Sequence, residues 1–410
     1  MKYIVILGDG MADYPVEELN GATPLEVASK PTMDGLARKS ICGLVKTVPE
    51  GMPPGSDTAN LSVMGYDPQV YYTGRSPLEA VSMGIHMQKE DVAYRCNIVS
   101  MDGDGAYEDC IMRDYSCDEI PTEESEVLIR YLDEYFRKEN VKLYPGISYR
   151  HCLILQKAET GCDLTPPHDI SDKGVKDFLP KGKNSELLYD MMQKSRELLK
   201  NHPINEARIK RGVRPATSLW FWGEGRKPAL STYQEKYGIR GAVVSAVDLI
   251  KGIGMCAELD NIEVEGATGN IHTNFKGKAM AAVDTLKNGN DYVYVHVEAP
   301  DECGHRHEVE NKVLSIEKID KEVIAPILSE MENRNEDFRM LILPDHPTPL
   351  SLRTHVSDPV PFILYDSTKA SDKGIDSYTE KNAEKTGVFV EKGHTLMDIL
   401  IRGGDENYAH

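Results

Sequence analysis

The segment 296–307, with the sequence HVEAPDECGHRH, carries side chains that could bind a metal ion. Asp301 and His305 stand four residues apart, so one helical turn would direct both side chains the same way. A carboxylate oxygen and an imidazole nitrogen that converge in this way suit a divalent cation such as Zn²⁺ or Mn²⁺. Taken alone, the same spacing also fits a capped helix start with a solvated histidine.

A second carboxylate, Asp9, follows an apolar run at residues 3–7 and stands between Gly8 and Gly10. A near-continuous apolar run is the pattern of a strand that is buried on both faces of a parallel sheet. The flanking glycines allow the backbone to turn sharply after it. Open α/β sheets bind their ligands at the carboxyl ends of such strands. An aspartate in a simple turn would have the same neighbours. Asp9 therefore indicates a ligand site only in combination with the other strand-end residues.

The pattern recurs near the end of the chain, where a buried strand is predicted at residues 338–343. Asp345 and His346 follow this strand, and His355 stands nine residues after His346. Another strand is predicted at residues 292–295, before Asp301. Because the carboxyl ends of parallel strands meet at one edge of a sheet, we expect the three strand-end aspartates to converge.

These positions supply more ligands than one tetrahedral ion accepts. Two ions roughly 3.5–4 Å apart would use all of them and would form the clamp found in phosphoryl-transfer enzymes. The sequence therefore predicts a two-metal site. The residues are Asp9, Asp301, His305, Asp345, His346 and His355.

A Pro- and Gly-rich loop over residues 49–60 leads to Ser56, which opens a helical pattern. The simplest interpretation makes Ser56 the N-cap of that helix. The alternative is functional, because a hydroxyl at a helix N-terminus lies among free N–H groups that would stabilise a phosphoryl group.

Composition limits the partners of the chain. Its 410 residues are 40% hydrophobic, which predicts two domains more readily than one. The formal net charge is −19, without a dense block of Lys and Arg, so nucleic acid and anionic membranes are not expected as partners. A small anionic substrate would need local cations to hold it.

The cysteines and the apolar runs predict a soluble cytoplasmic protein. Eight cysteines are scattered without a C-x-x-C pair, a pattern of reduced thiols rather than of a disulfide framework. The N-terminal apolar run is too short for a signal peptide, and no later run approaches the roughly 18 residues of a membrane span. There is no G-x-x-x-x-G-K-[ST] motif, so a P-loop kinase is excluded.

The pattern of predicted secondary structure changes between residues 91 and 214. Short strands predicted at 94–99 and 152–156 alternate there with helices predicted at 125–139 and 185–201. We therefore predict an α/β fold in which residues 1–90 and 215–410 form a metal-binding domain and residues 91–214 form an inserted lobe.

Four motifs together resemble the archaeal-type cofactor-independent phosphoglycerate mutases of the alkaline phosphatase superfamily. The resemblance covers nearly the whole chain, in the order of the family. It implies a mostly parallel, alkaline-phosphatase-like sheet with helices on both faces and a smaller inserted α/β lobe that binds substrate. The motifs are GDG at 8–10, GSDTAN at 55–60, APDECGH at 299–305, and PDHPTP at 344–349 with RTH at 353–355.

The resemblance also implies roles for the site residues. Ser56 corresponds to the nucleophile that becomes a phosphoserine, and metal ligation would supply its alkoxide. Two divalent ions are implied, with Mn²⁺ as the first choice, Mg²⁺, Zn²⁺ and Co²⁺ as alternatives, and no bisphosphoglycerate. One ion would be held by Asp9, Ser56, Asp345 and His346, and the other by Asp301, His305 and His355.

The substrate contacts follow less directly, because Asp102–Ala106 lacks the histidine of the D-G-x-H-S loop in the bacterial branch of these mutases. The candidates to clamp a phosphate or carboxylate of the substrate are Arg150, His151 and Lys278.

The implied activity is that of a glycolytic isomerase, which interconverts 2- and 3-phosphoglycerate through a phosphoserine. A homo-oligomer is compatible with it. Three alternatives stay open at this stage: a homoserine kinase that uses the same site, a metal-dependent phosphatase, and a non-catalytic scaffold with structural metals. The scaffold leaves the serine among the ligands unexplained.

Overall fold

The computed structural model describes residues 1–369 and 374–403 and divides the chain into two compact units. Unit 1 contains residues 1–72 and the described residues from 230 onward, and unit 2 contains residues 73–229. The lobe expected at 91–214 lies within unit 2, which is longer at both ends. The extensions contain helix α5 (Ser76–Ser82) and strand β9 (Ser218–Arg226), and both pack on strand β3 (Val92–Asp102).

Within the described residues, unit 1 is built on an eight-stranded sheet in the order β11-β10-β12-β1-β13-β14-β2-β15. Strand β14 runs antiparallel to both neighbours, whereas the other pairings are parallel, so the predicted mostly parallel sheet is confirmed. The strands are β1 (Lys2–Gly8), β2 (Ile41–Val45), β10 (Gly241–Val244), β11 (Asp260–Asn261), β12 (Tyr292–Val297), β13 (Phe338–Leu343), β14 (Val360–Asp366) and β15 (Phe389–Val390).

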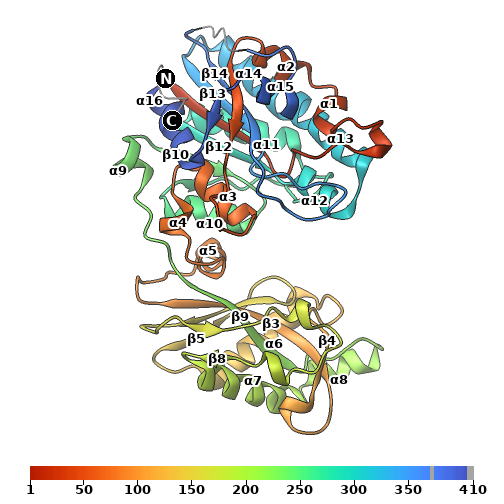
Figure 1. Cartoon of the computed structure of the whole chain (residues 1–410). Helices are drawn as coiled ribbons and strands as arrows, with labels where there is room; N and C mark the ends of the chain where they lie inside the picture. Colours follow the sequence, from red (N-terminus) through yellow and green to blue (C-terminus); the bar gives the residue numbers. More distant parts are fainter. Residues whose placement is uncertain (370–373, 404–410) are drawn as a thin grey trace. The chain divides into compact units, whose positions relative to one another are not determined.

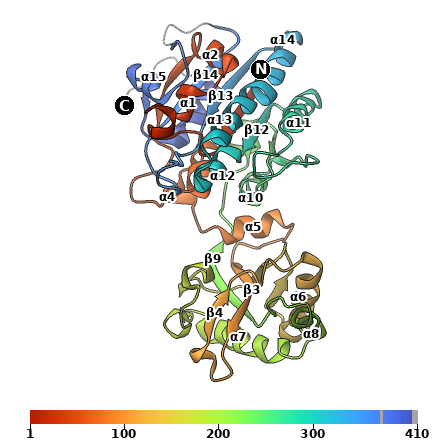
Figure 2. The ribbon, with the colours of Figure 1, turned by 90° about the vertical axis from the view of Figure 1, so that its right-hand side faces the viewer.

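Helices cover both faces of this sheet. On one face, Ile4 and Ile6 of β1 share a core with Phe275 of α11, and Figure 2 shows α11, α13 and α14 grouped beside β12 and β13. On the other face, the hydroxyl of Tyr294 reaches Asn60 of α3. The helices are α1 (Pro24–Val27), α2 (Pro31–Ala37), α3 (Ser56–Val63), α4 (Pro68–Tyr71), α9 (Tyr233–Tyr237), α10 (Asp248–Cys256), α11 (Phe275–Lys287), α12 (Ala299–Arg306), α13 (Val309–Lys318), α14 (Ala325–Asn333), α15 (Glu380–Lys385) and α16 (Leu396–Arg402).

The three central strands explain why unit 1 can hold a site. Strands β12, β1 and β13 are parallel neighbours, with Gly8 beside Val297 and Leu7 beside Leu343. Every residue of β12 is buried, as its apolar pattern predicted. Because the three strands end at the same edge, the segments that follow them begin close together.

Unit 2 is an antiparallel α/β unit with its own core. Strand β3 pairs with β4, β6 and β9, and β6 pairs with β5. Leu128 and Leu132 of α6 and Leu188 and Met192 of α7 pack into the core beneath these strands. The remaining elements of unit 2 are β4 (Ile111–Asp114), α6 (Thr122–Phe136), β5 (Val141–Tyr144), β6 (Arg150–Leu155), β7 (Cys162–Asp163), β8 (Lys181–Gly182), α7 (Ser185–Leu199) and α8 (Pro203–Lys210).

In the part of the chain that the structure describes, no helix combines the length and the apolar character that a membrane span requires. A cytoplasmic location stays a prediction of the sequence.

Candidate metal centre

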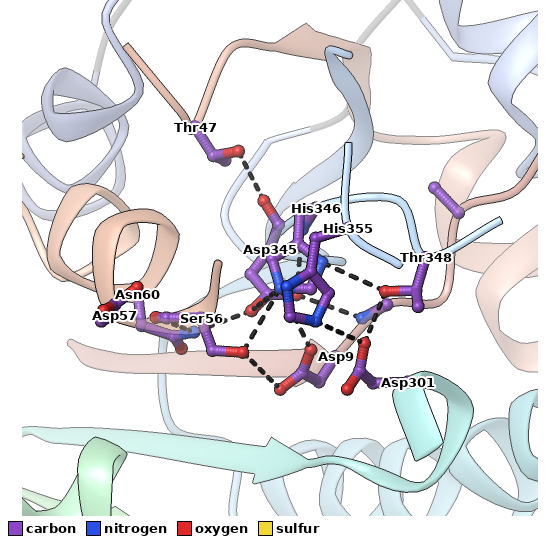
Figure 3. A network of polar contacts seen from close by, with 12 residues as sticks. Asp9, Thr47, Ser56, Asp57, Asn60, Asp301, Asp345, His346, Thr348 and His355 are labelled. Atoms are coloured by element: carbon purple, nitrogen blue, oxygen red, sulfur yellow. Dashed lines mark hydrogen bonds and ion pairs between the residues drawn. The ribbon is translucent and has the colours of Figure 1, made fainter. Parts of the chain in front are cut away.

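The carboxyl ends of β1, β12 and β13 bring three carboxylates together, as the sequence predicted. Asp9 follows β1, Asp301 lies in the first turn of α12 after β12, and Asp345 follows β13. Gly10 makes this approach possible: its φ is +61°, and a Cβ there would stand 2.7 Å from the backbone of Asp301 and 2.6 Å from the hydroxyl of Thr348. Figure 3 shows the three carboxylates directed toward Ser56, His346 and His355.

The first group of possible ligands is Asp9, Asp345 and His346, whose ligand atoms lie within 4.8 Å of one another. His346 Nε2 lies 3.4 Å from Asp345 Oδ2 and 3.7 Å from Asp9 Oδ1. Ser56 joins them, because its Oγ lies 3.4 Å from Asp9 Oδ2 and 3.3 Å from His346 Nε2. All four residues implied for the first ion are therefore adjacent.

Ser56 is not the N-cap of α3. That position belongs to Gly55, and Ser56 is the first residue of the helix, with its side chain outside any capping bond. The capping interpretation of the sequence was thus wrong by one residue. The shift frees the hydroxyl of Ser56 to face the carboxylate and imidazole groups of the site.

The second group contains Asp301 and His355, with His346 shared between the two groups. Nε2 of His355 lies 3.3 Å from Asp301 Oδ1. Asp301 and His305 lie one turn apart in α12, as predicted from their spacing, and His305 Nε2 is 3.2 Å from Asp301 Oδ2. Nε2 of His305 also lies 2.9 Å from Nε2 of His355. The structure brings together all three residues implied for the second ion.

The crowding of carboxylates shifts their protonation. Burial, followed by the negative charge of Asp345, raises the pKa of Asp9 well above its usual value. Burial also acts to raise the pKa of Asp301, but hydrogen bonds from His305 and His355 outweigh it and hold that pKa well below the usual value. The partner histidine responds in the opposite direction, because its bond to Asp301 raises the pKa of His305 to about 9. Burial lowers the pKa of His346.

These observations fit bound cations. Within the described chain, the buried Oδ1 of Asp9 has no hydrogen-bond partner, although an unpaired buried carboxylate oxygen is costly. A cation between Asp9, Asp345 and His346 would satisfy that oxygen and offset the repulsion between the carboxylates. Carboxylate oxygen and imidazole nitrogen are donors that Zn²⁺ and Mn²⁺ accept.

Several residues that hold the ligands in place were missed by the sequence interpretation. The side-chain amide of Asn60 donates to Asp345 Oδ2 at 2.8 Å and to the main-chain oxygen of Ser56 at 2.9 Å. Its oxygen accepts from the hydroxyl of Tyr294 at 2.6 Å. The hydroxyl of Thr348 donates to Asp301 Oδ1 at 2.5 Å. These residues could have been found in the sequence, because they are polar side chains within segments that are apolar or tightly packed.

The predicted substrate residues do not join this cluster. Lys278 is fully buried in unit 1, where its ammonium donates to the main-chain oxygen of His296 at 2.9 Å and burial lowers its pKa to about 8. This burial favours a structural role over a contact with substrate. His151 is buried in unit 2, and its Nδ1 accepts from the backbone N–H of Gly146 at 3.0 Å. Arg150 is exposed in unit 2.

Arg150 belongs to a group of arginines that the sequence did not reveal. Burial, partly offset by Glu79, lowers the pKa of Arg95, and the positive charges of Arg75 and Arg150 add to the shift. Glu79 lies 3.0 Å from Arg95 and 2.9 Å from Arg75. The guanidinium of Arg95 also stacks over Trp222, 4.1 Å from the ring centre. Arg75 and Arg95 thus share the carboxylate of Glu79, and Arg150 brings a further positive charge near Arg95.

The chain matches known proteins along almost all of its length. The family model for 2,3-bisphosphoglycerate-independent phosphoglycerate mutase matches residues 37–205. The enzyme of that name from Methanosarcina acetivorans is 47% identical over 405 residues, which cover 98% of this chain and 100% of the relative. A probable enzyme of the same name from Geobacter sulfurreducens is 47% identical over 401 residues, with 98% and 100% covered.

Two solved structures are similar as well. The PH0037 protein from Pyrococcus horikoshii has 30% identity and a TM-score of 0.81, with 98% of this chain and 96% of that chain covered. The cofactor-independent phosphoglycerate mutase from Thermoplasma acidophilum has 24% identity and a TM-score of 0.67, with 98% and 99% covered, and shows the same fold. The identity shared with the curated relatives over nearly their whole length shows that this chain belongs to the family of 2,3-bisphosphoglycerate-independent phosphoglycerate mutases.

Proposed function

We propose that this protein interconverts 2-phosphoglycerate and 3-phosphoglycerate through a phosphoserine formed on Ser56. The observation that carries the proposal is the position of the Ser56 hydroxyl, which is free of helix capping and contacts both Asp9 and His346. The names of the full-length relatives support the choice of substrate.

The same proposal assigns two divalent ions to the site, with Mn²⁺ as the first choice. Asp9, Ser56, Asp345 and His346 would hold one ion, and Asp301, His305 and His355 would hold the other. When bound, the ions would lower the pKa of the serine hydroxyl and neutralise charge on the phosphoryl group. The mixed oxygen and nitrogen donors of both groups support this assignment.

The residues of the chain then account for both halves of the reaction. The hydroxyl of Ser56 loses its proton, its Oγ bonds to phosphorus, and the bond from phosphorus to the glycerate oxygen breaks while that oxygen takes up a proton. In the second half, the other hydroxyl of glycerate gives up its proton and bonds to phosphorus, the bond from phosphorus to Oγ of Ser56 breaks, and Ser56 regains a proton. Asn60 holds the main-chain oxygen of Ser56, so the nucleophile keeps its place between the two steps.

Substrate recognition falls to unit 2 in this proposal. Arg75, Arg95 and Arg150 carry the charge that a phosphoglycerate needs, in a chain whose net charge is −19. Guanidinium groups bind carboxylates and phosphates through paired hydrogen bonds. We assign the first contact with substrate to Arg150, which is exposed, and a supporting role to Arg95, which is stacked on Trp222.

Ser56→Ala tests the proposal directly. Turnover of 3-phosphoglycerate by the metal-loaded protein should fall by several orders of magnitude, while the melting temperature moves by only a few degrees. Wild-type protein quenched with substrate should carry phosphate on the peptide that contains Ser56, and the variant should not. Ser40→Ala is the matched control, since it removes a buried hydroxyl from the end of α2 in the same unit.

Two outcomes would contradict the proposal. If Ser56→Ala turned over near the wild-type rate, the phosphoserine mechanism would be excluded. If the wild type phosphorylated homoserine from ATP but left 3-phosphoglycerate unchanged, the site would belong to a kinase.

A further inference from the structure

His296 is a polar residue inside an apolar strand, and the roles proposed above leave it unused. It is the fifth residue of β12, among Tyr292, Val293, Val295 and Val297, and its side chain is fully buried. A buried imidazole needs partners for both ring nitrogens, because an unpaired one is costly. Each nitrogen of His296 has one: Nδ1 lies 3.2 Å from Oγ of Ser245, and Nε2 lies 2.9 Å from Oδ2 of Asp9.

The direction of these bonds follows from the groups at each end. Nδ1 of His296 faces a hydroxyl, which can donate or accept, and Nε2 faces a carboxylate. As a metal ligand Asp9 is ionised, and an ionised carboxylate only accepts, so Nε2 of His296 carries a hydrogen and donates it. Nδ1 then accepts, and Ser245 supplies the hydrogen. The geometry of Ser245 agrees, because its oxygen already accepts from the backbone N–H of Val247 at 3.0 Å, which leaves its own hydrogen to donate.

These hydrogen bonds fix the orientation of the Asp9 carboxylate. Oδ2 takes the bond from His296 and the longer contact with Ser56. Oδ1 is buried and, among the described residues, has no hydrogen-bond partner, and it faces Nε2 of His346 at 3.7 Å. The oxygen that faces His346 is thus the one kept free of hydrogen bonds.

The backbone beneath His296 is held as well. Lys278 of α11, itself fully buried, donates to the main-chain oxygen of His296 at 2.9 Å. A buried ammonium needs a hydrogen-bond acceptor, and this bond holds the carboxyl end of β12 against α11. His296 is held at its side chain by Ser245 and at its carbonyl by Lys278, so its Nε2–H is a rigid donor.

We propose that Ser245 and His296 form a positioning relay that directs Oδ1 of Asp9 toward a bound metal ion. The relay rests on the proposed function only in taking Asp9 as a metal ligand. His296 itself is a positioning residue, since its Nε2 is occupied by the bond to Asp9. Partners of this kind orient ligands and typically change metal affinity 10–100-fold when they are removed.

The first measurement is the tautomer of His296, read from the ¹⁵N shifts of its imidazole by NMR. We expect the Nε2–H form in the metal-free protein and the same form after Zn²⁺ is added. A Nδ1–H form, or loss of the Nε2 hydrogen when Zn²⁺ binds, would overturn the relay, because the second result would make His296 a ligand.

The second measurement is the dissociation constant for Zn²⁺, determined by calorimetry without any substrate. His296→Phe should weaken binding roughly 10–100-fold, and His296→Gln, which keeps an N–H donor, should recover part of the loss. His272→Phe is the control, since His272 is an exposed histidine of the same unit. If His296→Phe does not fold, Ser245→Ala replaces it and should weaken binding to a smaller degree while allowing both tautomers.

Zn²⁺ affinity that is unchanged in the folded His296 variant, or in Ser245→Ala where that variant replaces it, would overturn the relay. These readouts separate the relay from the mutase proposal. A wild-type protein that binds Zn²⁺ through this relay but does not convert 3-phosphoglycerate would refute the proposed function and leave the relay intact.

Discussion

The buried Arg208 of unit 2 and the carboxylate cluster of unit 1 bury charge in contrasting ways. In unit 2, the guanidinium of Arg208 is almost wholly buried, and each of its nitrogens has a partner: Glu124 at 2.6 Å and the main-chain oxygens of Arg214 at 2.9 Å and Cys117 at 2.5 Å. In unit 1, Asp9 and Asp345 are buried next to each other, and burial and the negative charge of Asp345 raise the pKa of Asp9. The charge of Arg208 is balanced by groups of the protein itself. The negative charge of the carboxylate cluster requires a cation from outside the chain.

The contrast shows how a fold separates stability from function. A buried cation bonded to an acid and to carbonyls supports the core around it. A cluster of like charges costs stability, and it persists because the parallel sheet and its helices hold the three strand ends together. Unit 1 also holds a balanced pair, in which the buried ammonium of Lys312 lies 2.7 Å from the carboxylate of Asp13. The unbalanced cluster in the same unit is the one that adjoins the candidate nucleophile.

Removal of the metal ions should produce the largest difference between the two units. EDTA is expected to abolish mutase turnover and to lower the melting temperature of unit 1, since an ion at 100 times its dissociation constant stabilises the folded state by about 2.7 kcal/mol. The two tryptophans of the chain, Trp220 and Trp222, both lie in β9 of unit 2. Their fluorescence should therefore report an unchanged transition. A tryptophan transition that moves as far as the calorimetric one would show that the units do not unfold separately.

Asp9→Asn should raise the stability of the metal-free protein and at the same time lower turnover. The fold disfavours the charged form of Asp9, because burial and Asp345 raise its pKa. Removing that charge should stabilise the metal-free protein by about 1–2 kcal/mol while turnover falls by orders of magnitude. Chemical denaturation in EDTA measures the first effect. Asp284→Asn, at an exposed aspartate of α11 in unit 1, is the control and should leave both quantities nearly unchanged. Destabilisation by Asp9→Asn would mean that the carboxylate is not repelled in the fold.

Arg150→Ala should affect binding without affecting the metal cluster. Loss of a charge-assisted hydrogen bond is worth about 1.5–3 kcal/mol, so KM for 3-phosphoglycerate should rise roughly 10–150-fold. Zn²⁺ affinity should not change. Arg130→Ala removes another exposed arginine, which pairs with Glu126 on α6, and should leave KM as it is. Equal effects of the two substitutions would remove Arg150 from the substrate site.

The smallest expected effect is the acid sensitivity of unit 2. Burial lowers the pKa of His151 to about 3, below its value of about 6.5 in an unfolded chain. The unfolded state therefore binds the extra proton, so the contribution of this residue is complete above about pH 6.5 and is lost as the pH falls toward 3. His151→Gln keeps an acceptor for Gly146 and should make the tryptophan-monitored decline over this range shallower.

His86→Gln, at an exposed histidine of unit 2, is the matched control for this acid effect. A slope unchanged by His151→Gln would show that other groups dominate the acid unfolding of unit 2.

The site was largely predictable from the sequence because its ligands follow strands that are buried on both faces. Such strands are recognisable as short apolar runs, and parallel strands share one edge, so Asp9, Asp301 and Asp345 could be expected to meet. The i, i+4 spacing of Asp301 and His305 was equally informative, since it depends only on the pitch of a helix. These inferences need no knowledge of which elements pack together.

What the sequence could not determine depended on contacts between distant segments. Unit 2 reaches residues 73 and 229 because α5 and β9 both pack on β3, and no local pattern marks the pairing of β9 with β3 across more than a hundred residues. The resemblance made Lys278 a candidate to clamp a phosphate or carboxylate of the substrate, yet its side chain is buried and donates to the main-chain oxygen of His296 in β12. The amino-acid order determined which residues end the strands. Tertiary packing decided which polar groups orient them, because burial and hydrogen bonding arise only where separate elements meet.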